Sequence, residues 1–232
     1  MSKKPLNRNQ RRHQAAQPAF DKRTLWVLIP VIALIALIVI GATTLNNKPM
    51  ENGDTARAQD PSLLSGKHFV QIDVKDYGSL ICELNADVAP ISVTNFLKLA
   101  DEGFYDGLTF HRIISNFMIQ GGDPLGNGTG GSEVPIKGEF AANNYQNDIQ
   151  HLRGAISMAR SANYDSGSSQ FFIVHQDSPH LDGQYAAFGH VLVGMEVVDA
   201  ICAAAQPTDG NGSIAPEQQP VIERIVRIGQ PE

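Results

Sequence analysis

Cysteine is scarce in this chain of 232 residues, which contains only Cys82 and Cys202. Two cysteines cannot form the disulfide framework of a small secreted domain. There is no CxxC pair, and no Cys/His cluster has the spacing of a zinc site. Cys82 falls in a strand pattern and Cys202 ends a helical pattern, so two isolated buried thiols are favoured over a bridge. The sequence therefore predicts a protein without a metal site.

Basic residues are also scarce once the first 24 residues are left out. The chain has a formal net charge of −6. Residues 1–24 contain seven Lys and Arg against one Asp, a balance of +6, which leaves −12 for the rest of the chain. Binding of phosphate backbones needs a basic face. An acidic folded portion therefore argues against nucleic acid as a partner.

Motifs of two common enzyme classes are missing or incomplete. No G-x-S-x-G elbow is present, so a Ser/His/Asp hydrolase using the serines within 166–169 is a disfavoured alternative. The glycines within 126–131 match GxGxxG by spacing, but a proline-containing segment follows them instead of a helix. These glycines are better explained as letting a loop turn tightly beside a groove.

One long apolar run is present near the N-terminus. Residues 25–45 contain no charge and would extend about 31 Å as a helix, close to the ~30 Å hydrocarbon core. The sequence predicts a single-pass signal anchor in the cell membrane, preceded by a disordered basic tail over 1–24. The basic flank predicts a cytoplasmic N-terminus and an extracytoplasmic domain. A cleaved signal peptide is the alternative, but the A-x-A match at 56–58 lies well beyond the run.

After the anchor, the sequence predicts a flexible stalk over 46–63 and one folded domain over 64–232. Two helices are expected, one opened by Pro90 and stopped by Gly103, and one over 195–204. Short strand patterns lie at 68–74, 80–84, 154–159, 170–174, 186–193 and 221–228. Many short strands without βαβ alternation predict a mainly β protein with a closed antiparallel barrel.

The most informative stretch is 110–131, which opens with a strand-like run and ends in a glycine-rich loop. Arg112, Phe117, Met118 and Gln120 supply a guanidinium, an aromatic ring, a thioether and an amide. None of these groups is a nucleophile or a good general base. A site built from them can hold an apolar ring and direct hydrogen bonds at an amide, but it is poorly suited to cleaving one.

An X–Pro peptide bond fits such a site. Its rotation crosses a barrier of about 18–20 kcal/mol, because resonance gives the C–N bond partial double-bond character. In the twisted transition state the prolyl nitrogen becomes pyramidal and can accept a hydrogen bond. An arginine directed at that nitrogen binds the transition state better than the planar ground state, which raises the rate. No metal or cofactor is required.

Several segments resemble the cyclophilins, the peptidyl-prolyl cis-trans isomerases, including bacterial members. They occur in the family's order and, with the ending PVIERIVRI, cover about 64 to 228. The matching segments are FHRIISNFMIQGGDP followed by NGTGG, SMAR, SSQFFIVH and LDGQYAAFGHVLVGMEVVDAI. The resemblance implies an eight-stranded barrel capped by a helix at each end.

The resemblance also implies roles for single residues. Arg112 would be the catalytic guanidinium, and Gln120 would orient it or bind substrate backbone. The other matching positions would bind the substrate: Phe117, Met118, Ala159, Gln170, Phe172, Leu181 and Tyr185. Without the resemblance, Arg112 could equally be a surface charge and the apolar residues plain core. His111 should point to the opposite strand face and have a structural role.

Three positions depart from the family pattern. His180 stands where many cyclophilins have a tryptophan, Tyr185 where they have a histidine, and Arg160 where a polar amide is common. Tyrosine keeps an aromatic wall and a hydroxyl, so catalysis should survive. Loss of the indole N–H predicts weak binding of cyclosporin.

The sequence as a whole predicts a membrane-anchored isomerase that acts on proline-containing polypeptides and assists the folding of exported proteins. The alternative from another class is a proline-peptide-binding module or holdase chaperone with little turnover. Retention of Arg112 argues against that alternative.

Overall fold

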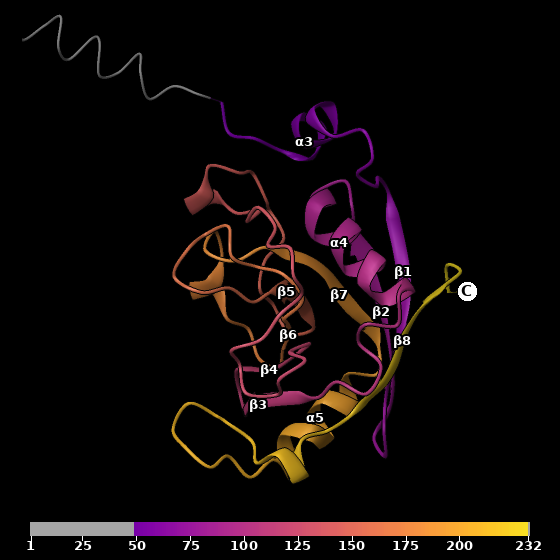
Figure 1. The fold of residues 1–232 in the computed structure, drawn as a ribbon, viewed down its shortest axis with the longest axis vertical. Coiled ribbons are helices and arrows are strands. Elements are labelled where there is room, and N and C mark those ends of the chain that lie inside the picture. The colour runs from indigo at the N-terminus through magenta and orange to yellow at the C-terminus, as the bar shows by residue number, and fades with distance from the viewer. Residues whose placement is uncertain (1–48, 232) are drawn as a thin grey trace, which may run out of the picture. The chain divides into compact units, whose positions relative to one another are not determined.

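The computed structural model describes residues 49–231 of the chain (Figure 1). The basic tail at 1–24 and the membrane anchor at 25–45 that the sequence predicts lie outside the described residues. Within 49–231, no helix combines the length and the apolar character needed to cross a membrane.

The described part of the chain is built on one antiparallel sheet of eight strands, in the order β3-β4-β6-β5-β7-β2-β1-β8. The strands are β1 Lys67–Val74, β2 Gly78–Asn85, β3 Phe110–Ile114, β4 Met118–Gly121, β5 Ala155–Met158, β6 Phe171–Val174, β7 Ala187–Val193 and β8 Ile222–Ile228. These strands confirm the predicted mainly β fold. Each strand pattern found in the sequence corresponds to one of them.

The sheet curls so that its two edge strands approach each other at one point. An isolated antiparallel bridge joins Thr109, before β3, to Val221, before β8. The N–H of Phe110 donates to Pro220 O at 2.9 Å, and the N–H of Ile222 donates to Leu108 O at 2.7 Å. Closure of the predicted barrel is therefore limited to this short contact, and no continuous ladder joins β3 to β8.

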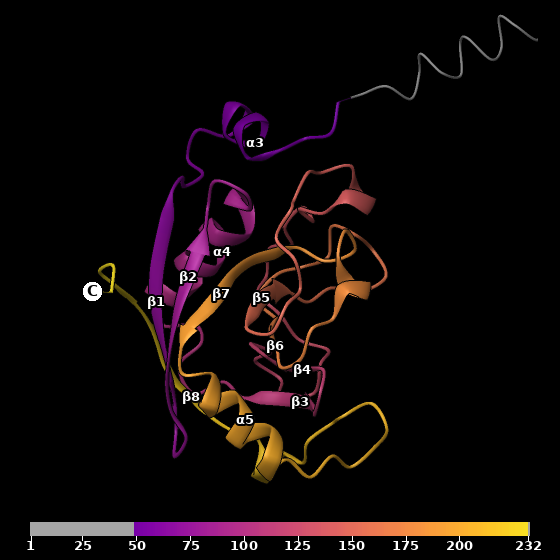
Figure 2. The ribbon, with the colours of Figure 1, turned by 180° about the vertical axis from the view of Figure 1, so that it is seen from behind.

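Two longer helices complete the predicted architecture, α4 Pro90–Asp101 and α5 Met195–Ala204. They lie toward opposite ends of the curled sheet in both views (Figures 1 and 2). Helix α4 begins with Pro90 and has no side-chain cap at Ala89. Instead, the buried Glu139 carboxylate accepts the N–H groups of Ile91 and Ser92 at 2.9 and 2.8 Å. A distant residue thus satisfies first-turn donors that the helix leaves free.

An aromatic cluster fills the space between α4 and the sheet. Phe96 of α4 lies 5.0, 5.3 and 5.2 Å, between ring centroids, from Tyr105, Phe171 and Phe188. All four side chains are fully buried. Aromatic contacts of this kind add about 0.5–1.5 kcal/mol each to the burial of their area. The cluster therefore anchors the helix to strands β6 and β7.

The segment predicted as a flexible stalk contains an ordered helix, α3 Gly53–Gln59. Asn52 and Thr55 form a capping box at its start. Arg57 donates to Ala86 O at 2.8 Å, and Glu51 pairs with Lys137. The sequence analysis missed this helix because polar contacts to distant loops, and not an apolar face, hold it in place. The compact unit accordingly begins at Met50, not at residue 64.

We predict that Phe96→Ala lowers the free energy of unfolding by about 3–5 kcal/mol, because it leaves a cavity in the aromatic cluster. Urea unfolding followed by circular dichroism measures this loss. Leu125→Ala is the control, since that side chain is 65% exposed, and it should change stability by less than about 0.5 kcal/mol. Equal effects of the two substitutions would show that the cluster is not central to stability.

Candidate active site

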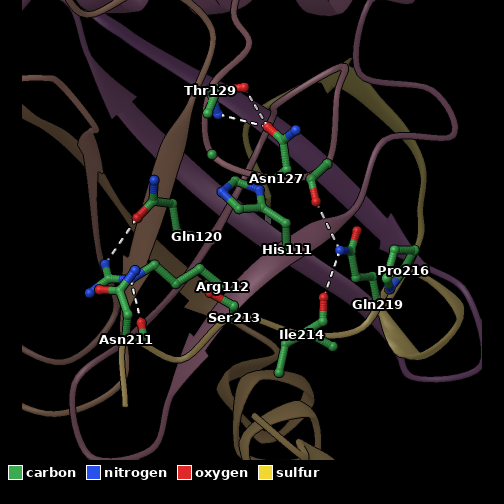
Figure 3. Close-up of a pocket in the computed structure, with 12 residues that line it drawn as sticks. His111, Arg112, Gln120, Asn127, Thr129, Asn211, Ser213, Ile214, Pro216 and Gln219 are labelled. Carbon is green, nitrogen blue, oxygen red and sulfur yellow. Dashed lines mark hydrogen bonds between the residues drawn. The ribbon is translucent and has the colours of Figure 1, made fainter. Parts of the chain in front are cut away.

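The site begins at an irregularity in strand β3. Phe110 pairs with Gly121 and Arg112 with Gln120, so the register shifts across His111 and one extra residue lies on β3. Such a bulge re-aims side chains. His111 and Arg112 consequently line the same polar cavity of about 490 Å³ (Figure 3). The prediction that His111 points to the opposite face assumed a regular strand and is wrong.

His111 is 4% exposed, and neither ring nitrogen has a hydrogen-bond partner among residues 49–231. Burial lowers the pKa of His111, with a smaller contribution in the same direction from Arg112 and an opposing one from Asp123. The imidazole beside the guanidinium is therefore held toward its neutral form.

Arg112 is oriented by two oxygen acceptors (Figure 3), and Met118 Sδ lies 3.9 Å from its Nη1. Its Nε donates to Asn211 O at 2.7 Å and its Nη1 donates to Gln120 Oε1 at 3.1 Å. No carboxylate in the described chain lies within ion-pair distance of it, and Nη2 makes no hydrogen bond there. Burial lowers the pKa of Arg112, but an arginine stays protonated in proteins. The site thus presents a fixed cation with one free terminal nitrogen.

A short chain of amides holds Gln120 in turn. Gln120 Nε2 donates to Gln170 Oε1 at 2.9 Å, and Gln170 Nε2 donates to Gly130 O at 2.7 Å. Because each amide nitrogen is used as a donor, the oxygen of Gln120 is left to accept from Arg112. The glycine-rich loop therefore orients the guanidinium through two side chains.

Beside Arg112 lies a pocket of about 190 Å³ whose lining combines five apolar side chains with two arginines, a glutamine and a tyrosine. It is lined by Arg112, Phe117, Met118, Gln120, Ala159, Arg160, Phe172, Leu181 and Tyr185. The structure therefore brings together every predicted site residue except Gln170, which is one hydrogen bond away from Gln120. We refer to this space as the apolar pocket. The sequence analysis did not assign Arg160 to it.

All three departures from the family pattern lie at or beside this pocket, since Arg160 and Tyr185 line it and His180 contacts its Phe117 wall. The His180 ring lies 5.5 Å from the Phe117 ring, between centroids, at a tilt of 31°. The Tyr185 ring meets Phe172 edge-on at 5.9 Å. Both therefore keep a flat ring against the pocket walls, and neither provides an indole N–H.

A Ser–His–Asp chain, which the sequence analysis missed, lies behind the pocket. His151 Nδ1 is 2.9 Å from Asp182 Oδ1, and His151 Nε2 is 3.0 Å from Ser157 Oγ. The order of groups matches a hydrolase triad, but Ser157 is fully buried and His151 is 1% exposed. A substrate cannot reach the hydroxyl. Instead, the imidazole stacks on Phe172 at 6.0 Å and supports the pocket wall.

The cysteines are both buried and free, as predicted. Burial raises the pKa of both thiols, that of Cys202 to about 11. The described residues contain no group of three potential metal-ligating side chains.

The sequence of this chain is similar to proteins of known activity. The sequence profile of the family described as cyclophilin type peptidyl-prolyl cis-trans isomerase/CLD matches residues 69–227. The chain belongs to the cyclophilin family. It is an enzyme, a peptidyl-prolyl cis-trans isomerase (EC 5.2.1.8).

Curated cyclophilins from several bacteria are similar to this chain. Peptidyl-prolyl cis-trans isomerase B of Bacillus subtilis is 50% identical over 123 residues, which cover 53% of this chain and 82% of the relative. A probable peptidyl-prolyl cis-trans isomerase of Brucella suis is 40% identical over 168 residues, covering 67% and 80%.

The fold is likewise that of a solved cyclophilin. A crystal structure of a Cryptosporidium parvum cyclophilin, obtained in the presence of the dipeptide Ala-Pro, superposes with a TM-score of 0.61. It is 31% identical and covers 70% of this chain and 99% of the other. The cyclophilin fold predicted from the resemblance is thus confirmed.

We predict that the free energy of unfolding of this cyclophilin falls as the pH drops below about 6.5. Burial lowers the pKa of His151, against the opposing effect of Asp182. The folded protein therefore keeps His151 neutral at a pH at which the unfolded chain binds a proton. Unfolding takes up that proton, so acid favours unfolding.

The measurement is urea unfolding between about pH 7 and pH 5. His151→Gln should show a shallower pH dependence than the parent protein, and the exposed His190 provides the control His190→Gln, which should keep the parent slope. Identical slopes for all three proteins would show that His151 is not the buried neutral group.

Proposed function

We propose that Arg112 accelerates rotation about X–Pro bonds by donating a hydrogen bond to the prolyl nitrogen as the amide twists. One observation carries the proposal: a guanidinium without a carboxylate partner forms part of the wall of the apolar pocket. Its Nη2 is left free for a substrate. A salt-bridged arginine could not turn to a weak acceptor such as a prolyl nitrogen.

The chemistry requires that the bond be stronger in the transition state than in the ground state. In the planar amide the nitrogen lone pair is delocalised and accepts poorly. When the bond twists, the lone pair localises and the charge-assisted donor binds it. Such a bond contributes about 3 kcal/mol, or roughly a hundredfold in rate. No covalent bond forms or breaks, so the site needs no nucleophile.

The apolar pocket would hold the proline ring. Its walls combine Phe117, Phe172 and Leu181 with the flexible Met118, which suits a compact apolar ring. Support comes from the similar Cryptosporidium parvum cyclophilin, whose crystals were obtained with Ala-Pro present. Weak cyclosporin binding remains our expectation, because His180 offers no indole N–H at the pocket edge.

We predict that Arg112→Ala lowers kcat/KM for a proline peptide at least about tenfold, because it removes the donor to the twisted amide. Arg112→Lys should recover only part of the loss, since one ammonium cannot use the acceptors that orient the guanidinium. Exchange NMR on the full chain measures the rate, and circular dichroism checks the fold.

The control for this experiment is Arg227→Gln, which removes a surface guanidinium paired with Asp101. It should keep the parent rate. Full activity of Arg112→Ala would remove the proposed mechanism, and binding without turnover in the parent protein would favour a proline-peptide-binding module.

We further propose that this isomerase is anchored in the cell membrane by residues 25–45 and assists the folding of exported proteins. The support is the uncharged run with a basic excess on its N-terminal side. Slow X–Pro isomerisation can limit the folding rate of any proline-containing chain, including exported ones.

We predict that protease added to intact spheroplasts digests the isomerase domain, because the basic flank keeps the N-terminus inside. Immunoblotting with antibodies to the domain measures the loss, and a cytoplasmic protein in the same cells is the control for intact membranes. Protection of the domain in spheroplasts but not in lysates would reverse the proposed orientation.

A further inference from the structure

The arginines of the described chain fall into two groups. Four have a carboxylate partner: Arg57 with Asp54, Arg153 with Asp199, Arg224 with Asp73 and Arg227 with Asp101. Within 49–231, only Arg112 and Arg160 have none. Both of these line the apolar pocket. Two cations that are not neutralised thus lie at one site.

The lack of a carboxylate partner for Arg160 is unexpected given the net charge of the chain from residue 49 onward. From residue 49 onward the chain has 23 Asp and Glu against 10 Lys and Arg. In such an acidic domain a free guanidinium attracts carboxylates, so an unpaired one indicates that the fold keeps them away. For Arg112 the mechanism proposed above explains this separation. For Arg160 another reason is needed.

Arg160 is held in one position by aromatic rings and carbonyl groups. Its guanidinium carbon lies 5.1, 4.9 and 4.6 Å from the ring centroids of Phe140, Tyr164 and Tyr185. Nε and Nη2 donate to Gln184 O at 3.1 and 2.9 Å, and Nη1 donates to Ser161 O at 2.8 Å. A guanidinium has five N–H groups, so each terminal nitrogen keeps one for a further acceptor.

Arg160 also lines a second space beside the apolar pocket, which we call the side cavity. It has a volume of about 230 Å³ and shares Gln120, Ala159 and Arg160 with the apolar pocket. Its remaining polar side chains are hydroxyls and one amide, from Thr129, Ser161, Ser166, Ser168 and Gln170. No carboxylate lines it. The side cavity thus combines one positive charge with several hydrogen-bond donors.

We propose that Arg160 makes this isomerase selective for substrates with an acidic side chain close to the proline. With the proline in the apolar pocket, a neighbouring substrate residue lies at the side cavity, where its carboxylate accepts from Arg160. The inference rests on the proposed placement of the proline. Because the guanidinium is already fixed, little side-chain freedom is lost on binding.

The size of the preference follows from the exposure of the site. Arg160 is partly exposed, so solvent and salt weaken its attraction for a carboxylate. We expect a Glu peptide to exceed the matching Gln peptide about three- to tenfold in kcat/KM. The ratio should fall toward one in about 0.5 M salt, where the screening length is only a few ångströms.

The test compares proline peptides that differ only by Glu or Gln at one position, placed in turn at the two residues before and the two after the proline. Exchange NMR on the full chain gives kcat/KM without an auxiliary protease. The expected result is a preference for Glu at one or more of these positions, which Arg160→Gln abolishes and Arg160→Glu reverses. Arg227→Gln removes an equal charge far from the pocket and should keep the ratio.

Three results separate this inference from the proposed function. Equal turnover of Glu and Gln peptides by the parent protein overturns the role of Arg160 and leaves that of Arg112 in place. A Glu preference that survives in Arg160→Gln also overturns the proposed selectivity role, because Arg160 would then only pack against the aromatic rings. Lack of turnover with every peptide overturns the proposed function. If Arg160→Gln does not fold, Arg160→Lys must retain a Glu preference that salt removes.

Discussion

The structure depends on keeping one guanidinium oriented but not neutralised. A salt bridge would fix Arg112 more strongly, yet it would satisfy the charge that a twisted amide must meet. The chain uses neutral acceptors instead, the carbonyl of Asn211 and the amide oxygen of Gln120. Neutral acceptors orient the donor and leave its charge available. The hydrogen bonds from Gln120 to Gln170 and from Gln170 to the glycine-rich loop hold that arrangement.

The same constraint explains the surroundings of the site. The chain is strongly acidic after its N-terminal region, yet neither the apolar pocket nor the side cavity is lined by a carboxylate. Burial lowers the pKa of His111 and His151, so both imidazoles are held toward the neutral form. They therefore add little positive charge beside the site. The Ser157–His151–Asp182 chain uses hydrolase groups to support Phe172, because burial removes them from any substrate.

Much of the site could be predicted because it is local in the sequence. Arg112, Phe117, Met118 and Gln120 lie on two adjacent strands joined by a short turn, so their spacing and chemical types already indicate a pocket. The strand and helix patterns were also visible, since burial of one face imposes a period on the sequence. The failures have physical reasons. The bulge at His111 breaks the alternation on which face predictions rely, and α3 is held by polar contacts that leave no apolar pattern.

The sequence alone determined the family, the β-rich fold, most residues of the apolar pocket and the net negative charge of the chain after its first 24 residues. It could do so because local periodicity and contiguous motifs are written along the chain. Only the tertiary structure decided that His111 shares a cavity with Arg112, that Ser157, His151 and Asp182 meet, and that Arg160 has no carboxylate partner. Those facts depend on which distant segments come together and on which charges the fold keeps apart, and spacing along a chain does not encode distances between its loops.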